Sequence, residues 1–328
     1  MNINNIDIFE NELREQMPSV LELLLKDHST KMNIFWGTDD YKLLGSGYEY
    51  NSPILPELIT GDNGSVIMPR VKKEILLQQT RVRDMAEVFT PSWICNKQNN
   101  LIDNAWFGSE NVFNIEIDNT VGTHSWKTNH DRIAFSNGKT WKDYVKDTRL
   151  EISCGEAPYI TSRYDTTTAE FIPVENRIGI LDRKLRVVSE NVDESGEWLK
   201  AAQNAYKNTY AFEWQGDSLL LARESMLITF IENYLAKFGK EPLLKSIKFI
   251  AYIISWNVWQ MDGLKGVVPN SCKDDSTVQL FGEPIISQCQ GCKNDNINKH
   301  NGIYCLIKDW ANKGKKIRFI DLLNEEKK

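Results

Sequence analysis

The chain has 328 residues, of which 41% are hydrophobic, and it carries a formal net charge of −6 at pH 7. Its length and hydrophobic content suffice for one large core with appended segments. The negative charge argues against a protein that binds nucleic acid unaided, because phosphate contacts need a basic surface, so any DNA binding would need a partner or a local patch. No apolar run reaches the about 20 residues of a membrane-spanning helix, and the acidic N-terminus is unlike a signal peptide, so we expect a cytoplasmic protein with no membrane partner.

Residues 1–85 are predicted to form a helical and hairpin extension. Apolar residues recur at helical spacing in three segments, and Asn63-Gly64, a dipeptide typical of hairpin turns, lies between two short apolar runs. The elements expected from these patterns are helices over 8–15, 19–26 and 71–85, and a hairpin that joins 58–60 to 66–68.

The stretch LEISCGEAPYI, residues 150–160, has the pattern of a β-strand that ends in a tight loop. Residues 149–152 form the expected strand, and Gly155 and Ala157 supply small residues to the turn. In an open α/β sheet, ligands bind outside the carboxyl ends of the strands, where small residues allow close approach of the backbone. The stretch therefore indicates a cofactor loop, with a plain strand and turn as the alternative.

This stretch resembles motif I of the S-adenosylmethionine-dependent amino-group DNA methyltransferases of restriction-modification systems. The family pattern is Asp-Pro-(Ser/Ala)-Cys-Gly-Ser-Gly-x-Phe-Leu. Here Glu151 stands at the Asp, Ser153-Cys154-Gly155 match, and Glu156 and Ala157 replace Ser-Gly. Upstream, Ala86 to Pro91 resembles motif X, whose Phe-Thr-Pro lies against the cofactor; a simple helix stop before the proline is the alternative.

Two later segments resemble motifs II and III of the same family. Glu213, at the end of a predicted strand over 210–213, matches the acid that accepts hydrogen bonds from the ribose hydroxyls; Asp217 competes, although its place beside Ser218 suits helix capping. Asp262 in the sequence WNVWQMDGL matches the residue that holds the adenine amino group, with a plain Asp-Gly turn as the alternative. Helices are expected over 178–192, 195–207, 218–238 and from Pro242 onward.

The resemblance implies a Rossmann-like α/β methyltransferase domain over residues 86–270 that binds S-adenosylmethionine, in keeping with the alternation of strands and helices. The cofactor-binding residues that it implies are Phe89, Thr90, Pro91, Glu151, Ser153, Cys154, Gly155, Glu156, Ala157, Glu213 and Asp262.

Residues 271–328 are predicted to form a cysteine-rich zinc module with a terminal strand. Cys289 and Cys292 have the spacing of a zinc knuckle, and thiolate and imidazole ligands suit Zn²⁺. We expect the ligands to be Cys272, Cys289, Cys292 and Cys305, with His300 in place of Cys272 as an open alternative. A redox pair or unrelated free thiols are the other interpretations, and Cys95 and Cys154 are expected to be small buried hydrophobes.

The family's motif IV, (Asn/Asp/Ser)-Pro-Pro-(Tyr/Phe), which holds the flipped target base, has no match because the chain contains no Pro-Pro. The resemblance therefore implies one subunit of a split adenine-N6 DNA methyltransferase, with no catalytic residue of its own. A partner chain would supply motif IV and DNA recognition, and its strand is expected to pair near residues 317–323. The alternatives are a non-catalytic scaffold that holds a restriction partner, and a complete methyltransferase for another substrate.

Overall fold

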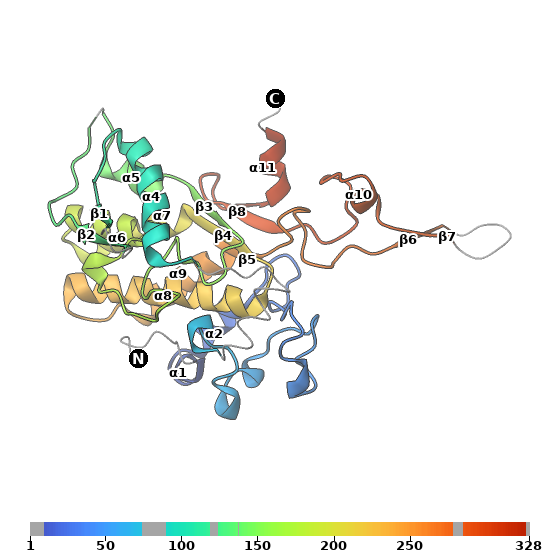
Figure 1. Cartoon of the computed structure of the whole chain (residues 1–328). Coiled ribbons are helices and arrows are strands. Elements are labelled where there is room, and N and C mark those ends of the chain that lie inside the picture. Colours follow the sequence, from blue (N-terminus) through green and yellow to red (C-terminus); the bar gives the residue numbers. More distant parts are fainter. Residues whose placement is uncertain (1–9, 74–89, 119–123, 137, 278–284, 326–328) are drawn as a thin grey trace.

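The computed structural model describes residues 10–73, 90–118, 124–136, 138–277 and 285–325 (Figure 1). It is a mixed α/β fold with four small sheets in the described part of the chain. No helix among the described residues has both the length and the apolar character needed to cross a membrane. The predicted helix over 71–85 and Phe89 of the predicted motif X lie outside the described residues, apart from the first three positions of that helix.

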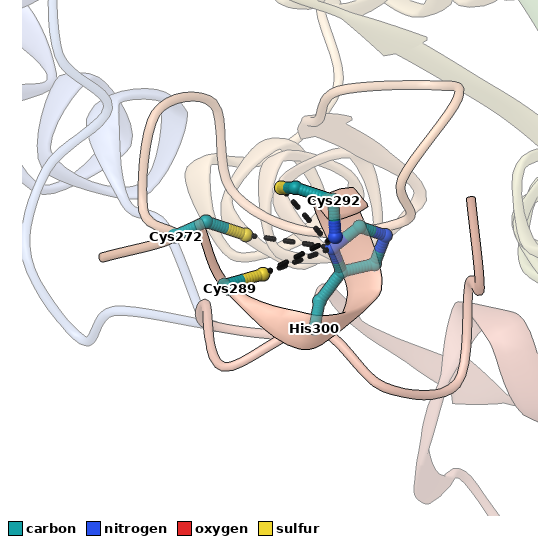
Figure 2. Close-up of side chains that lie close together, drawn as sticks. All are labelled: Cys272, Cys289, Cys292 and His300. Carbon is teal, nitrogen blue, oxygen red and sulfur yellow. Dashed lines mark hydrogen bonds between the residues drawn. The ribbon is translucent and has the colours of Figure 1, made fainter. Parts of the chain in front are cut away.

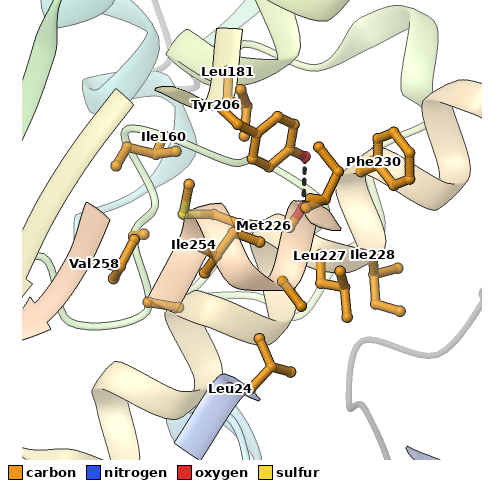
Figure 3. Packing of buried hydrophobic residues seen from close by; sticks show 14 of the residues in the cluster. Leu24, Ile160, Leu181, Tyr206, Met226, Leu227, Ile228, Phe230, Ile254 and Val258 are labelled. Carbon is orange, nitrogen blue, oxygen red and sulfur yellow. Dashed lines mark hydrogen bonds between the residues drawn. The ribbon is translucent and has the colours of Figure 1, made fainter. Parts of the chain in front are cut away.

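The helix α8 (Gly216–Phe238) forms the centre of the core, and every residue from Gly216 to Tyr234 is buried. Three helices pack around α8: α6 (Ile180–Asn191), α7 (Ser195–Lys207) and α9 (Leu244–Asn257). Figure 1 shows α9 alongside α8. Figure 3 shows Met226 and Phe230 of α8 beside Tyr206, whose hydroxyl donates a 2.7 Å hydrogen bond to the Met226 carbonyl. Apolar residues lie on all sides of α8, as expected for a buried helix, and its buried Glu232 is paired with Arg163 and Arg177.

Three parallel strands lie beside these helices in the order β3-β4-β5. They are β3 (Arg149–Ile152), β4 (Thr209–Glu213) and β5 (Val258–Gln260), and each begins close to the end of a helix. The register pairs Glu151 with Ala211 and Glu213 with Gln260. The three strands that the motifs predicted therefore lie side by side with their carboxyl ends at one edge of the sheet.

The N-terminal segment belongs to the same core as the helices. The predicted helices are confirmed as α1 (Glu10–Gln16) and α2 (Pro18–Leu25), and α2 packs on α8 and α9. The buried residues of this segment, among them Trp36 and Ile54, form one hydrophobic cluster with α8. It is thus an integral layer of the fold and not a separate extension.

The predicted hairpin around Asn63-Gly64 is wrong. Short 3-10 helices occupy its place: η2 (Pro56–Leu58) and η3 (Gly61–Asn63), between η1 (Lys42–Leu44) and η4 (Arg70–Lys72). The hydroxyl of Thr60 donates a 2.7 Å hydrogen bond to the Pro56 carbonyl, and the Asn63 N–H donates to the Thr60 carbonyl. The N–H groups of Leu58 and Ile59, which a strand over 58–60 would pair, donate instead to the carbonyls of Leu55 and Pro56, and Ile67 is buried in the core.

A further layer covers the other side of the α6 and α7 pair. It comprises α4 (Ser92–Phe107), the antiparallel strands β1 (Asn114–Asp118) and β2 (His124–Thr128), α5 (Trp141–Lys146) and η5 (Val174–Asn176). The Asp103 carboxylate of α4 pairs with Arg183 of α6 at 2.6 Å, and both side chains are buried. This ion pair joins α4, which forms part of the cavity described below, to the core.

The C-terminal part contains two small antiparallel sheets. The hairpin of β6 (Asp275–Thr277) and β7 (Ile285–Ser287) reaches away from the body of the molecule, and α10 (Gln290–Lys293) follows it (Figure 1). The strands β8 (Leu306–Asp309) and β9 (Lys315–Arg318) pair with each other and lead into α11 (Phe319–Glu325). Of residues 317–323, only 317–318 lie in a strand and 319–323 are helical, so the expected terminal strand is shorter than predicted, and the pairing of a partner there stays a prediction.

Candidate functional site

A cavity of about 820 Å³ lies at the carboxyl ends of β3 and β4. Its volume is within the range of small-molecule sites, about 300–1,000 Å³. It is lined by the loop after β3, the turn after β4, α4 and part of the N-terminal segment. The residues predicted to bind the cofactor that line it are Thr90, Glu151, Ser153, Cys154, Gly155, Glu156 and Glu213.

The loop after β3 has a sharply turned backbone. Ser153, Gly155 and Ala157 all have positive φ angles, of 48°, 53° and 60°. Such angles favour glycine, so the two non-glycine residues store strain of the kind found at ligand sites. The loop is held by the Cys154 N–H, which donates 3.0 Å to the Phe212 carbonyl, and by the Ala157 N–H, which donates 2.7 Å to the Cys154 carbonyl. Ala157 itself is fully buried beneath the cavity wall.

The carboxylate of Glu213 joins this loop to the end of β4. Its Oε2 accepts a 2.8 Å hydrogen bond from the Gly155 N–H, while Oε1 accepts from the N–H groups of Trp214 and Gln215. Burial raises the pKa of Glu213 in spite of these three donors. A carboxylate has about four acceptor positions, so Glu213 retains capacity for a ligand hydroxyl.

Glu151 lies deeper in the same wall. Its carboxyl oxygens accept hydrogen bonds from the N–H groups of Tyr159, at 3.4 Å, and Ile160, at 3.1 Å. Burial raises its pKa to about 8, against the opposing effect of these two donors, and the charge of Glu213 adds to the rise. Glu151 is therefore mostly protonated at neutral pH until a cation approaches.

Glu156 connects the loop to the N-terminal segment. It accepts a 2.7 Å hydrogen bond from the Arg70 N–H and a 2.6 Å bond from the Tyr164 hydroxyl. Thr90 lines the cavity too, and its carbonyl accepts a 3.1 Å hydrogen bond from the Thr166 hydroxyl. Pro91 is the N-cap of α4, outside the residues that line the cavity.

Asp262 does not line the cavity, contrary to its predicted place at the adenine. Its Oδ1 accepts hydrogen bonds from the N–H groups of Leu264 and Lys265, and its Oδ2 pairs with the Lys265 ammonium at 3.2 Å. The aspartate is thus occupied with its own Asp-Gly turn, the simpler interpretation of the sequence. Asp217, the alternative to Glu213, pairs with Lys73 at 3.1 Å and accepts a hydrogen bond from the Tyr41 hydroxyl, and it is not among the residues that line the cavity.

The N-terminal segment supplies a wall of the cavity that no sequence pattern indicated. Gly37 and Tyr50 line it, and the Trp214 indole N–H donates a 2.6 Å hydrogen bond to the Tyr50 hydroxyl. A Cβ atom on Gly37 would lie 2.9 Å from the Trp214 carbonyl oxygen, so only glycine permits this close approach. The Gln260 amide of β5 donates to the carbonyls of Phe35 and Trp214, which fixes the segment to the sheet.

A second site lies in the C-terminal module, where three cysteines and one histidine converge (Figure 2). The Sγ atoms of Cys272, Cys289 and Cys292 lie 3.6, 3.7 and 3.6 Å from Nδ1 of His300. Tetrahedral Zn²⁺ with Zn–S of about 2.3 Å and Zn–N of about 2.0–2.1 Å requires S···N separations of about 3.6 Å. These four side chains can therefore hold one metal ion, and the dimensions fit zinc.

The backbone around this Cys3His group is shaped for it. A Cβ atom on Gly291, between the two knuckle cysteines, would lie 2.6 Å from Nδ1 of His300. The Cys292 N–H donates a 3.4 Å hydrogen bond to Sγ of Cys289. Burial opposes ionisation of Cys289, but N–H groups of Asn301 and Cys292 outweigh it and lower its pKa to about 6. Burial and the adjacent thiols raise the pKa of Cys272 to about 12, since neighbouring thiolates repel without a cation.

Cys305 is not part of this group, so its predicted role as a ligand is corrected. Its Sγ donates a 3.3 Å hydrogen bond to the Gln260 carbonyl, and its side chain packs with Phe212 and Trp259. His300 is the fourth member, together with Cys272, which the sequence had left as alternatives to each other. Cys95 and Cys154 are buried, as predicted.

No family model, curated protein or solved structure matches this chain. The cavity and the Cys3His group therefore carry the functional argument.

Proposed function

We propose that this chain is the S-adenosylmethionine-binding subunit of a split adenine-N6 DNA methyltransferase from a restriction-modification system. The observation that carries the proposal is the hydrogen bond from the Gly155 N–H to Glu213, which joins predicted motifs I and II at the wall of one cavity. The parallel order β3-β4-β5 supports a Rossmann-like sheet in which motifs I, II and III follow successive strands.

The cavity suits a cationic nucleoside ligand. S-adenosylmethionine supplies the transferable methyl group and carries it on a positively charged sulfur. Three buried acidic side chains, Glu151, Glu156 and Glu213, line the cavity, and a cation beside them would favour their ionised forms. Glu213 would accept from the ribose hydroxyls, and the loop 153–157 would enclose the methionine part. Since Asp262 lies elsewhere, the rings of Tyr50 and Trp214 are the candidates for contact with the adenine.

The partner chain is proposed to add a strand to the outer edge of β3. The Arg149 N–H donates to Asn208 before β4, so the backbone groups of Leu150 and Ile152 point to the other side, where the described residues provide no strand. The side chains of Leu150 and Ile152 are 43% and 67% exposed. Parallel strands are normally covered on both faces, so an apolar strand of a second chain fits this edge.

The metal in this proposal is a structural Zn²⁺. The Cys3His group leaves no open coordination position for catalysis. Its loops are bonded to the segment after β5, since the Val268 N–H donates to the Ile303 carbonyl and the Cys305 N–H donates to the Gly266 carbonyl, at 2.8 and 3.1 Å. The metal would thus stabilise the chain between the sheet and the β8–β9 hairpin.

The proposal is tested by transfer of labelled methyl groups from S-adenosylmethionine to duplex DNA. The chain alone, a partner carrying an Asn-Pro-Pro-Tyr motif alone, and the two together are compared. We expect transfer only by the pair, because positioning of the target nitrogen is worth several kcal/mol. Ile152→Lys should abolish transfer and complex formation. Because Ile152 also lines the cavity, calorimetry of this variant with S-adenosylmethionine alone separates loss of the partner from loss of the cofactor. Ile115→Lys, on the exposed strand β1, is the matched control and should change neither transfer nor complex formation. Transfer by the chain alone would refute the split arrangement.

A further inference from the structure

A basic and aromatic surface lies on the side of the molecule away from the cavity. It is formed by the end of α7, the outer face of α9 and the β8–β9 hairpin, and we call it the lysine–aromatic surface. Its members are Lys207, Lys245, Lys248, Phe249, Tyr252, Lys308, Trp310 and Lys316.

The ammonium groups of Lys207, Lys308 and Lys316 lie over aromatic rings. The Nζ of Lys308 is 4.6 Å from the ring centre of Tyr252 and 4.9 Å from that of Trp310. The Nζ of Lys207 lies 5.6 Å from the ring of Phe249 and 5.5 Å from that of Trp310. These rings and cations therefore form one continuous patch from three elements that are distant in the sequence.

The helix α9 supplies the exposed part of the patch. Lys245, Lys248, Phe249 and Tyr252 recur at intervals of three or four residues and so share one face of the helix. A hollow of about 690 Å³ opens among them, and the ring of Phe249 is 38% exposed. The opposite face of α9, including Ile247 and Ile250, is buried in the core. The lysine face thus has no packing role inside the protein.

The positive charge of this surface is not neutralised within the described part of the chain. None of Lys207, Lys245, Lys248, Lys308 and Lys316 forms an ion pair there, whereas the chain as a whole carries a net charge of −6. The pKa of the nearby His28 is lowered to about 3, first by burial and then by the positive charges of Arg223, Lys26, Lys308 and Lys316. Asp309, on the same hairpin, accepts a hydrogen bond from the Asn312 N–H. Such a cluster of like charges is stabilised by a polyanion.

We infer that the lysine–aromatic surface binds single-stranded nucleic acid, with phosphates on the lysines and an unpaired base on Phe249. Lysines that track a backbone, together with rings that stack on bases, are the features of such sites. An acidic peptide would use the charge but not the ring of Phe249, and an anionic membrane, which can take up such a ring, is distinguished by the vesicle arm of the test below.

The surface is separate from the cavity. Lys207 lies just before β4, and the Trp310 indole N–H donates a 2.8 Å hydrogen bond to Asn257, just before β5. Both positions are at the amino ends of the strands, whereas the cavity is at the carboxyl ends of the parallel sheet. The inference therefore goes beyond the proposed function, in which DNA is held by the partner, and it does not depend on cofactor binding.

The test is fluorescence anisotropy of a labelled single-stranded oligonucleotide with the full chain, measured over a range of salt concentrations. With four or five phosphate contacts, the slope of log K against log salt should be about −3. Lys245→Glu with Lys248→Glu should weaken binding at least about tenfold and reduce the steepness of the slope by about 1.4. Phe249→Ala should weaken binding about fivefold with the slope unchanged, because stacking is independent of salt.

The control variant combines Lys142→Glu with Lys146→Glu, at two exposed positions on α5. It makes the same change of net charge elsewhere on the protein and should leave the affinity for the oligonucleotide within about twofold of the wild type. Circular dichroism confirms that each variant is folded. Three results would overturn the inference: no binding at low salt, equal loss in the α5 control, or binding of anionic vesicles and polyglutamate but not of the oligonucleotide.

Discussion

The N–H of Gly155 donates a 2.8 Å hydrogen bond to Oε2 of Glu213, 58 residues further along the chain. One residue belongs to the loop after β3 and the other ends β4, so the bond couples the two strand ends that line the cavity. The loop cannot move away from the sheet without leaving a buried carboxyl with one donor fewer.

Glu213→Ala should therefore weaken S-adenosylmethionine binding about ten- to a hundredfold, the loss of one or two charge-assisted hydrogen bonds. Calorimetric titration of the isolated chain measures it. Asp262→Asn is the matched control, since Asp262 lies outside the cavity wall, and its affinity should stay close to that of the wild type. Equal binding by wild type and Glu213→Ala would remove Glu213 from the site.

The raised pKa of Glu151 makes stability depend on pH. Its pKa rises from 4.5 to about 8 on folding, so the native state holds a proton that the unfolded chain releases. The contribution to stability is fully present below pH 4.5 and is lost as pH rises to about 8, on the order of 5 kcal/mol in total. Urea unfolding of wild type and Glu151→Gln across this range should show a steeper decline for the wild type. Parallel curves would contradict the assignment.

The Cys3His group should bind one zinc ion per chain, measured by elemental analysis of protein purified without chelator. His300→Ala should lose most of the metal, while Cys305→Ala should retain it, because the side chain of Cys305 packs with Phe212 and Trp259 instead. Chelation should loosen the C-terminal module more than α8, since metal-binding energy in such modules is folding energy. Loss of the metal from Cys305→Ala together with its retention in His300→Ala would identify Cys305, and not His300, as a ligand.

Glu232 on α8 is the shared acceptor of two buried arginines, Arg163 at 3.1 Å and Arg177 at 2.6 Å. Glu232→Gln should destabilise the protein by about 3–5 kcal/mol, because it leaves two buried cations short of a negative charge. Chemical denaturation measures the change. The exposed pair of Glu197 and Lys200 is the control, and Glu197→Gln should have no measurable effect, as for most surface pairs.

Local patterns were enough to predict α7 and α8, whereas α4, which lines the cavity, was not predicted. The predicted helix over 195–207 coincides with α7, and that over 218–238 differs from α8 by two residues at its start. Helix formation depends on apolar spacing and end signals within a short window, so it can be read from neighbouring residues. The strands before Gly155 and at Glu213 could likewise be predicted from neighbouring residues, and so could the pairing of Cys289 with Cys292 as metal ligands.

Contacts between distant segments decided the rest. By spacing, Cys305 was expected as a ligand and only Cys272 and His300 were alternatives, but Cys305 bonds through its backbone to Gly266 and its thiol lies in the core beside Trp259. Gly37 and Tyr50 line the cavity only because the N-terminal segment folds back onto the turn after β4. The lysine–aromatic surface likewise exists only where α7, α9 and the β8–β9 hairpin meet. Spacing along the chain determines which elements form, whereas long-range packing and hydrogen bonds determine which side chains face each other.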